Sequence, residues 1–249
     1  MARGLDILEL LDKSPKPMGV REISRQLDLS AAIIQRLINT LSEYDYVAQD
    51  PETRRYFIGY RAFGLGWSLT SKDRLISIAK PELDMLASQH LLNSYLGVRR
   101  DRRAIYVLSV QSDGPIAIRS APGSLTYLHS TALGKVLLAG LPDEEAHRLL
   151  TAEPLAQVTP QTVTDPESLM AELAAIRRQG YATVRSENIQ GVISVGAPIR
   201  DASGTVVAAL STAFPEWSTP EFTIDEVAKL VLGSAGRISQ SLGHQAQGT

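Results

Sequence analysis

The sequence contains no cysteine, which excludes disulfide bonds, thiolate metal sites and cysteine nucleophiles. Aromatic residues make up only 6% of the 249 residues, whereas hydrophobic residues make up 44%, enough for a sizeable core in one or two domains. An excess of one charge is also missing, because 25 Lys and Arg stand against 27 Asp and Glu. This balance excludes a basic coat over the whole surface and leaves a local basic face open.

The chain also lacks a run of about 20 apolar residues, the length that a bilayer-spanning helix requires. Near the amino terminus, Asp6, Glu9 and Asp12 interrupt the leucines and argue against a signal peptide. The four histidines do not show the spacing of metal ligands. We therefore expect a soluble, cytoplasmic protein that has no membrane partner and needs neither a metal nor a cofactor.

Residues 1–43 show the periodicity of three short helices. Leu5, Leu8 and Leu11 form an apolar stripe on the first. The third carries the clearest core stripe, with apolar residues at i, i+3, i+4 and i+7, namely Ile34, Leu37, Ile38 and Leu41. Two short strand-like runs follow, Val47–Gln49 and Tyr56–Tyr60, joined by a turn rich in Pro, Asp and Arg. This order predicts a winged helix-turn-helix over residues 1–72.

The helical spacing then indicates which side chains would meet DNA. Gln and Asn can pair with adenine and Arg with guanine in the major groove, while the start of a helix can hold a phosphate. The candidate DNA-binding residues are Ser30, Gln35, Arg36 and Asn39 on the third helix, with Arg54 and Arg55 at the hairpin tip. The alternative is a small helical domain whose exposed Gln and Arg are merely solvated.

Residues 73–90 are predicted to form a helical connector, and residues 91–249 a second domain. Its strand-like runs are Ser94–Val98, Ile105–Val110, Ile116–Arg119, Val192–Ile199 and Thr205–Thr212. Helical patterns lie between the third and fourth runs and at the end of the chain. Grouped strands and grouped helices predict an α+β domain with a largely antiparallel sheet.

Several motifs, weak singly but specific in their order and spacing, resemble those of IclR-type transcriptional regulators along nearly the whole chain. They are Leu5–Leu8, Asp50–Tyr56, His129–Lys135, Gly191–Ile199 and Asp201–Gly204. The resemblance implies an amino-terminal winged helix-turn-helix and a GAF-like effector-binding domain. It also implies dimers, often paired into tetramers, that bind an operator in double-stranded DNA and control catabolic operons in response to small organic acids.

The chain departs from the pattern of the family in two places. Ala31–Ile33 replace the polar start that relatives usually have on the recognition helix, so base readout would rest more on Gln35, Arg36 and Asn39. After Tyr181, where the family tends to place acidic residues, the chain has Val184 and Arg185. An effector held by an acidic side chain at Val184 in relatives would lose that contact here.

The resemblance implies effector-binding residues at Ala132, Leu133, Val192, Ser194 and Ser211. A helix capped by Ser130 or Thr131 would leave the N–H groups near Leu133 and Gly134 free for a carboxylate. A buried hydroxyl without a partner costs about 1–3 kcal/mol, so Ser194 and Ser211 suggest a polar ligand, unless each bonds a neighbouring carbonyl or water. Arg185 is a further effector-binding candidate if it points inward, the alternative being a solvent-facing arginine on an edge strand.

These patterns predict a ligand-responsive transcriptional regulator that senses a small carboxylic acid and is not an enzyme. A ligand-independent DNA-binding regulator remains an alternative. A hydrolase-like domain that uses His129 and Lys135 is another. The basic cluster Arg99–Arg103 could hold an anion, although it is more typical of a solvated hairpin tip.

Overall fold

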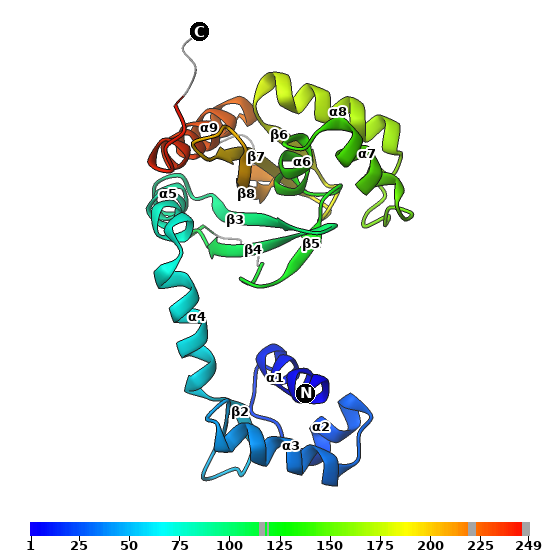
Figure 1. Ribbon diagram of the computed structural model, residues 1–249, viewed down its shortest axis with the longest axis vertical. Helices are drawn as coiled ribbons and strands as arrows, with labels where there is room; N and C mark the ends of the chain where they lie inside the picture. The colour runs from blue at the N-terminus through cyan, green and yellow to red at the C-terminus, as the bar shows by residue number, and fades with distance from the viewer. Residues whose placement is uncertain (115–117, 119, 219–222, 246–249) are drawn as a thin grey trace. The chain divides into compact units, whose positions relative to one another are not determined.

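The computed structural model describes residues 1–114, 118, 120–218 and 223–245, without the side chains of residues 69–71. The chain forms two compact units, Met1–Asp73 and Arg74–Thr249 (Figure 1). None of the described helices combines the length and the apolar character needed to cross a lipid bilayer.

The first unit is the predicted winged helix-turn-helix. Its elements in chain order are α1 (Ala2–Lys13), α2 (Val20–Leu27), α3 (Ala31–Glu43), β1 (Val47–Gln49), β2 (Tyr56–Ile58) and α4 (Tyr60–Lys72). The strands pair antiparallel, with Gln49 opposite Tyr56. A bridge between Met18 and Tyr56 ties this wing to the α1–α2 connection. The predicted order of helices and hairpin is confirmed.

The core of the first unit contains the stripe expected on α3. Ile34 and Ile38 are fully buried, and Leu37 and Leu41 are partly buried beside them. On α1, however, the expected stripe is wrong at its first position, because Leu5 is 55% exposed whereas Ile7 is fully buried. Two overlapping sets of residues share helical spacing there, and only the packing against α2 and α3 selects between them.

The second unit contains the other elements. They are α5 (Arg74–His90), β3 (Asn93–Arg100), β4 (Arg103–Val110), β5 (Leu125–Tyr127), α6 (Ala132–Ala139), α7 (Asp143–Thr151), α8 (Pro166–Gln179), β6 (Ala182–Arg185), β7 (Val192–Arg200), β8 (Val206–Pro215), the short helix η1 (Glu216–Ser218) and α9 (Ile224–Ser241). The strand expected at Ile116–Arg119 lies largely outside the described residues.

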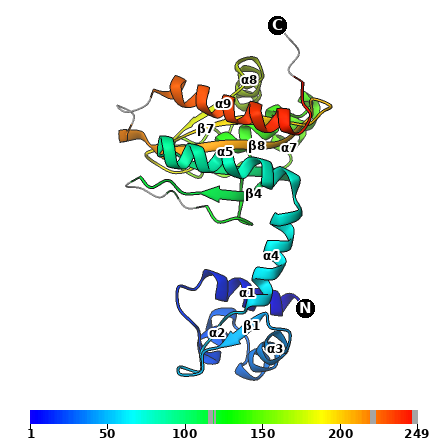
Figure 2. The same cartoon turned by 90° about the vertical axis from the view of Figure 1, so that its left-hand side faces the viewer.

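The sheet has the strand order β5-β4-β3-β8-β7-β6, and each neighbouring pair is antiparallel. Helices α5 and α9 lie side by side on one face, as Figure 2 shows. Helix α6 packs on the other face, with α8 and α7 behind it. The predicted α+β class with a largely antiparallel sheet is confirmed.

Helix α5 is part of the core of the second unit. Leu83 and Leu86 are fully buried, and the Glu82 carboxylate pairs with Arg237 of α9 at 2.6 Å. The hydrogen bond from Arg237 holds the pKa of Glu82 below its usual value. The division at residues 72 and 90, and with it a connector role for residues 73–90, stays a prediction.

Candidate functional site

The outer face of α3 presents the polar side chains expected there. Arg36 and Asn39 are exposed, and Gln35 is half-buried. The Gln35 amide donates to Asn39 Oδ1 at 2.8 Å and to the hydroxyl of Tyr56 at 3.4 Å. The two amides are thus held together on one face, one helical turn apart. Within the described residues the Arg36 guanidinium has no hydrogen-bonding or ionic partner, so it is free to reach outward.

Ser30 occupies the N-cap of α3. Its hydroxyl accepts a hydrogen bond from the N–H of Ile33 at 3.4 Å. A serine in this position stabilises the start of the helix. The N–H groups of the first turn, at Ala31 and Ala32, point outward beyond the cap and can meet a phosphate.

The two arginines at the wing tip differ in their contacts. The tip is shaped by the Asp50 carboxylate, which accepts hydrogen bonds from Glu52 and Thr53, and these bonds lower the pKa of Asp50. Arg54 is exposed and has no side-chain partner among the described residues. Arg55 donates to the carbonyl oxygen of Pro17 at 2.9 Å and to Glu22 at 3.1 Å, which ties the wing to α2.

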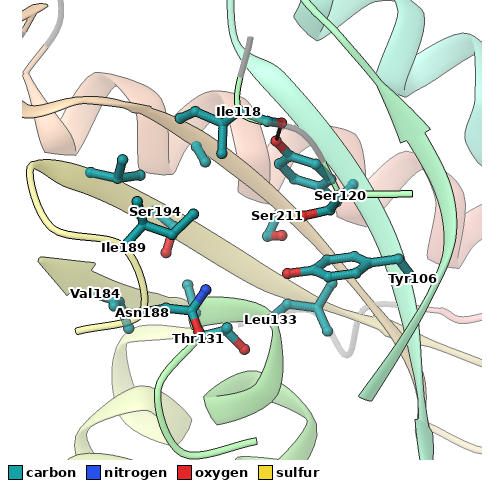
Figure 3. A pocket seen from close by; sticks show the side chains of 14 residues that line it. Tyr106, Ile118, Ser120, Thr131, Leu133, Val184, Asn188, Ile189, Ser194 and Ser211 are labelled. Atoms are coloured by element: carbon teal, nitrogen blue, oxygen red, sulfur yellow. Dashed lines mark hydrogen bonds between the residues drawn. The ribbon is translucent and has the colours of Figure 1, made fainter. Parts of the chain in front are cut away.

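A cavity lies in the second unit between the start of α6 and the sheet (Figure 3). Together with the open solvent at its mouth, the cavity leaves about 450 Å³ unfilled by protein atoms. Five residues expected at an effector site line it together, namely Ala132, Leu133, Val192, Ser194 and Ser211. The structure thus brings together side chains from α6, β7 and β8.

Hydroxyl groups from several elements face this cavity. Ser194 and Ser211 point into it in Figure 3, and neither hydroxyl has a hydrogen-bond partner in the described part of the chain. The hydroxyl of Tyr95 donates to the carbonyl oxygen of Ile118. Burial raises the pKa of Tyr95 and of Tyr106, so both phenols stay protonated at neutral pH.

The start of α6 forms one wall of the cavity. The Thr131 hydroxyl caps the helix by accepting the N–H of Gly134 at 3.0 Å, which leaves the N–H groups of Ala132 and Leu133 outside the helical ladder. The cap therefore occupies the N–H of Gly134, which was expected to be free. A Cβ on Gly196 would come within 3.0 Å of the Ala132 backbone, so this glycine lets β7 approach the helix start closely.

A buried ion cluster supports the segment that closes the cavity. Lys135 is 1% exposed, and its ammonium group lies 2.9 Å from Glu187 and 2.6 Å from Glu172. Burial raises the pKa of Glu187 against the lowering effect of Lys135. The next residue, Asn188, lines the cavity and accepts a hydrogen bond from the Ser130 hydroxyl at 3.1 Å.

Arg185 lies outside the cavity. Along β6 the residues alternate, so that Val184 is buried and lines the cavity while Arg185 is exposed. The guanidinium pairs with Glu216 at 3.1 Å. This is the solvent-facing alternative, and its physical reason is the two-residue period of a strand. The departure from the family at Val184, in contrast, falls directly on the cavity wall.

Sequence reasoning missed most of the polar lining. The additional residues are Tyr95, Tyr106, Ser120, Thr131 and Asn188. The two tyrosines occupy neighbouring antiparallel strands with ring centroids 5.5 Å apart. Both faces of these strands are covered by apolar cores, so alternation alone does not mark the tyrosines as facing the cavity. Nothing local in the sequence distinguishes Asn188 either.

His129 and Lys135, the two residues of the hydrolase-like alternative, each form hydrogen bonds with other groups. The His129 ring donates from Nε2 to the carbonyl oxygen of Ala156 at 3.0 Å, and desolvation lowers its pKa. Lys135 is held by Glu187 and Glu172. The described residues also contain no group of three or more His, Asp or Glu side chains that could hold a metal ion.

Comparisons with known proteins agree with this architecture. Residues 68–240 match the family described as Bacterial transcriptional regulator IclR C-terminal, and residues 1–51 match the IclR helix-turn-helix domain. The HTH-type transcriptional repressor AllR of Escherichia coli is 30% identical, over 99% of this chain and 91% of its own.

Two solved structures share the fold. The crystal structure of the Thermotoga maritima IclR has a TM-score of 0.84 and 29% identity over 98% of both chains. An IclR homologue from Microbacterium hydrocarbonoxydans, crystallised with 4-hydroxybenzoate, has a TM-score of 0.82 and 23% identity. The alignment covers 97% of this chain and 98% of that one.

A winged helix-turn-helix followed by an α+β unit with a cavity lined by hydroxyl groups defines a DNA-binding transcriptional regulator with an effector-binding domain. The family matches narrow this class. The chain belongs to the IclR family of transcriptional regulators. The resemblance seen in its motifs is thereby confirmed.

Proposed function

We propose that this regulator is switched by a small monocarboxylic acid bound in the cavity at the start of α6. The observation that carries the proposal is the pair of hydroxyls of Ser194 and Ser211, which face the cavity without a hydrogen-bond partner among the described residues. Both hydroxyls are open to the cavity, so a polar ligand can form hydrogen bonds with them without breaking a bond within the protein. The homologue from Microbacterium, which shares the fold, was crystallised with a small aromatic carboxylate.

The charge of the lining supports a ligand with a single negative charge. None of the described residues that line the cavity carries a charged side chain. The N–H groups of Ala132 and Leu133, at the positive end of the α6 dipole, can receive one carboxylate. A second carboxylate would have no cation to face, and its burial would be unfavourable. Arg185 contributes no charge to the wall because it is exposed.

On the DNA side, we propose that Gln35, Arg36 and Asn39 meet base edges in the major groove while Arg54 contacts the phosphate backbone or the minor groove. The first turn of α3, capped by Ser30, would hold a phosphate. Arg55 fixes the wing through Glu22 and adds a weaker DNA contact. A homodimer, alone or as a dimer of dimers, would place two such faces about 34–36 Å apart on a palindromic operator.

The acid would act by binding two arrangements of the regulator unequally, because a ligand with equal affinity for both shifts neither. Couplings of this kind are typically about 1–3 kcal/mol, or about 5–150-fold in affinity. In the cytoplasm such a change is enough to control a catabolic operon.

The test compares monoacids with diacids of matched size. Butyrate is paired with succinate and 4-hydroxybenzoate with terephthalate, and each is added to the protein during thermal unfolding and during operator binding. A monoacid is expected to raise the melting temperature and change operator affinity, while its diacid partner does neither. If neither kind of acid changes stability or operator affinity, the regulator acts without such a ligand and the proposal fails.

A further inference from the structure

The second unit contains another cleft, separate from the cavity described above. It opens between the β3–β4 turn, β5 and the α7–α8 connection, and it leaves about 690 Å³ unfilled by protein atoms. Leucines from α6, α7 and the α7–α8 connection form its apolar lining, namely Leu138, Leu149, Leu150 and Leu155. Arg102 of the β3–β4 turn and Arg103, the first residue of β4, also line the cleft.

Arg103 places a positive charge on this cleft without a matching carboxylate. Its guanidinium carbon lies 3.8 Å above the centre of the Tyr127 ring. The two residues are directly opposite each other on β4 and β5, so the ring holds the guanidinium in place by a cation–π contact. Arg103 forms no ion pair with any described carboxylate, and stacking leaves its edge N–H groups able to bind an anion.

The other charged side chains that line the cleft, Arg102 and Glu153, form an ion pair at its rim. Arg102 lies 2.6 Å from Glu153, whose side chain is 71% exposed. His129 also lines the cleft, and burial and the nearby cations Lys135 and Arg103 lower its pKa, so the ring is neutral at neutral pH. The lining therefore carries two positive charges and one negative charge.

An apolar lining with a net positive rim matches a particular kind of molecule. Leu138 and Leu150 are buried, whereas Leu149 and Leu155 remain partly exposed within the cleft. An apolar body would cover the leucines, and an anionic head would lie against the arginines through charge-assisted hydrogen bonds. The segment from Tyr127 to Thr131 separates the two sites: Tyr127 and His129 line the cleft, and Thr131 lines the cavity.

We propose that this cleft is a second ligand site, which binds a carboxylate with an apolar body. Arg103 and Arg102 receive the carboxylate, and Leu149 and Leu155 contact the body. The site is independent of the effector proposed for the cavity, because no residue lines both.

Octanoate is a suitable probe, with 1-octanol and octylammonium as its neutral and cationic counterparts. Binding to the full-length protein is followed by the methyl NMR signals of assigned leucines. Octanoate is expected to shift the signals of Leu149 and Leu155. Octanol should shift them less at the same concentration, and octylammonium should leave them unchanged.

Three variants test the role of charge. Arg103→Gln should weaken octanoate binding about 10-fold or more, the size of a lost charge-assisted hydrogen bond, and Arg103→Lys should recover part of the loss. Glu153→Gln frees Arg102 and should tighten binding about 2–5-fold. The matched control is Glu145→Gln, because Glu145 pairs with Arg99 near the end of β3 at 3.1 Å but does not line the cleft. The octanoate affinity of this variant should equal that of the wild type.

The outcomes that overturn the proposal are distinct from each other. Shifts confined to Leu133 would place octanoate in the effector cavity. Equal binding by the wild type and by Arg103→Gln, with unchanged circular dichroism, would show apolar adsorption without charge recognition. If dilution of the protein, and not octanoate, moves the Leu149 and Leu155 signals, the cleft is an interface between copies of the chain.

Discussion

The DNA-reading face and the effector cavity differ in how far apart in the chain their residues lie. The face uses side chains between Ser30 and Arg55, carried by one helix and one hairpin. The cavity collects side chains from Tyr95 on β3 to Ala213 on β8, together with the start of α6 and the connection that follows β6. One site is local and solvent-exposed, and the other is assembled by the fold.

This difference has consequences for substitution. Side chains on the outer face of α3 make few contacts with the core, so they can change without cost to folding. Cavity residues have close-packed neighbours, so a change in side-chain volume alters the stability of the protein as well as its ligand affinity. Substitutions at the two sites test this contrast.

The largest effect is expected at Gly134, on the helix that forms the cavity wall. A Cβ there would lie 2.4 Å from the carbonyl oxygen of Leu128, a backbone atom that cannot rotate away. Gly134→Ala should destabilise the second unit by up to about 3 kcal/mol in chemical or thermal unfolding.

The matched control is Gly236→Ala in α9. A Cβ at Gly236 would meet no atom within 4 Å, so the better helix propensity of alanine should leave stability unchanged or raise it slightly. Equal stability of the two alanine variants would show that the α6 wall is loosely packed and would remove the contrast between the sites.

On the DNA-reading face, substitution of Arg36 and of Arg54 should impair DNA binding in different ways. Arg36→Ala should lower discrimination between operator and unrelated DNA about 10-fold or more. Arg54→Ala should weaken binding to both kinds of DNA alike and reduce the salt dependence by about one phosphate contact. Binding measured at several salt concentrations separates these effects, and both variants should unfold like the wild type. Identical losses in the two variants would contradict the assignment of the faces.

Adjacent residues on β8 provide the corresponding test in the cavity. Ser211→Ala should weaken binding of the effector monoacid about 10-fold, because one hydrogen bond to a charged ligand is lost. Thr212→Val is the control, because Thr212 is fully buried, does not line the cavity and finds no hydrogen-bond partner for its hydroxyl among the described residues. Calorimetric titration should show wild-type affinity for this variant. A greater loss in the Thr212 variant would mean that the wrong face of β8 was assigned.

The smallest effect concerns pH. Burial holds the pKa of His129 below its ordinary value of 6.5, so the unfolded chain binds a proton more readily than the native protein in the window just below 6.5. Stability therefore rises with pH across this window and falls on acidification. Glu187, whose pKa is raised, contributes with the opposite sign at lower pH, near 4.5 and above.

The comparison of the wild type with His129→Gln isolates the histidine, because Glu187 is present in both. Melting temperatures at pH 8 measure the cost of the substitution itself, since the ring is then neutral in both states. Between pH 7 and pH 5.5 the wild type should lose more stability than the variant. Parallel pH profiles would show that the native protein does not exclude the charged ring.

Much of the fold could be predicted from the sequence. The stripe on α3 and the turn residues before Arg54 predicted the winged helix-turn-helix because helix and hairpin signals are local. The cavity was less accessible: Ser194 and Ser211 came from the resemblance, and Tyr95 and Tyr106 were missed. Their inward direction depends on strand register, which short alternating runs do not define.

Periodicity and turn chemistry within short stretches of sequence were enough to predict most of the elements and the fold class, although β5 and β6 were not predicted. The motifs carried the resemblance to the family. Three features became known from the three-dimensional packing alone: Leu5 faces outward, Arg185 pairs with Glu216, and Arg103 lies over Tyr127 beside a second cleft. The physical reason is that these contacts join residues from separate elements, and packing between elements selects among faces that look equivalent in the sequence.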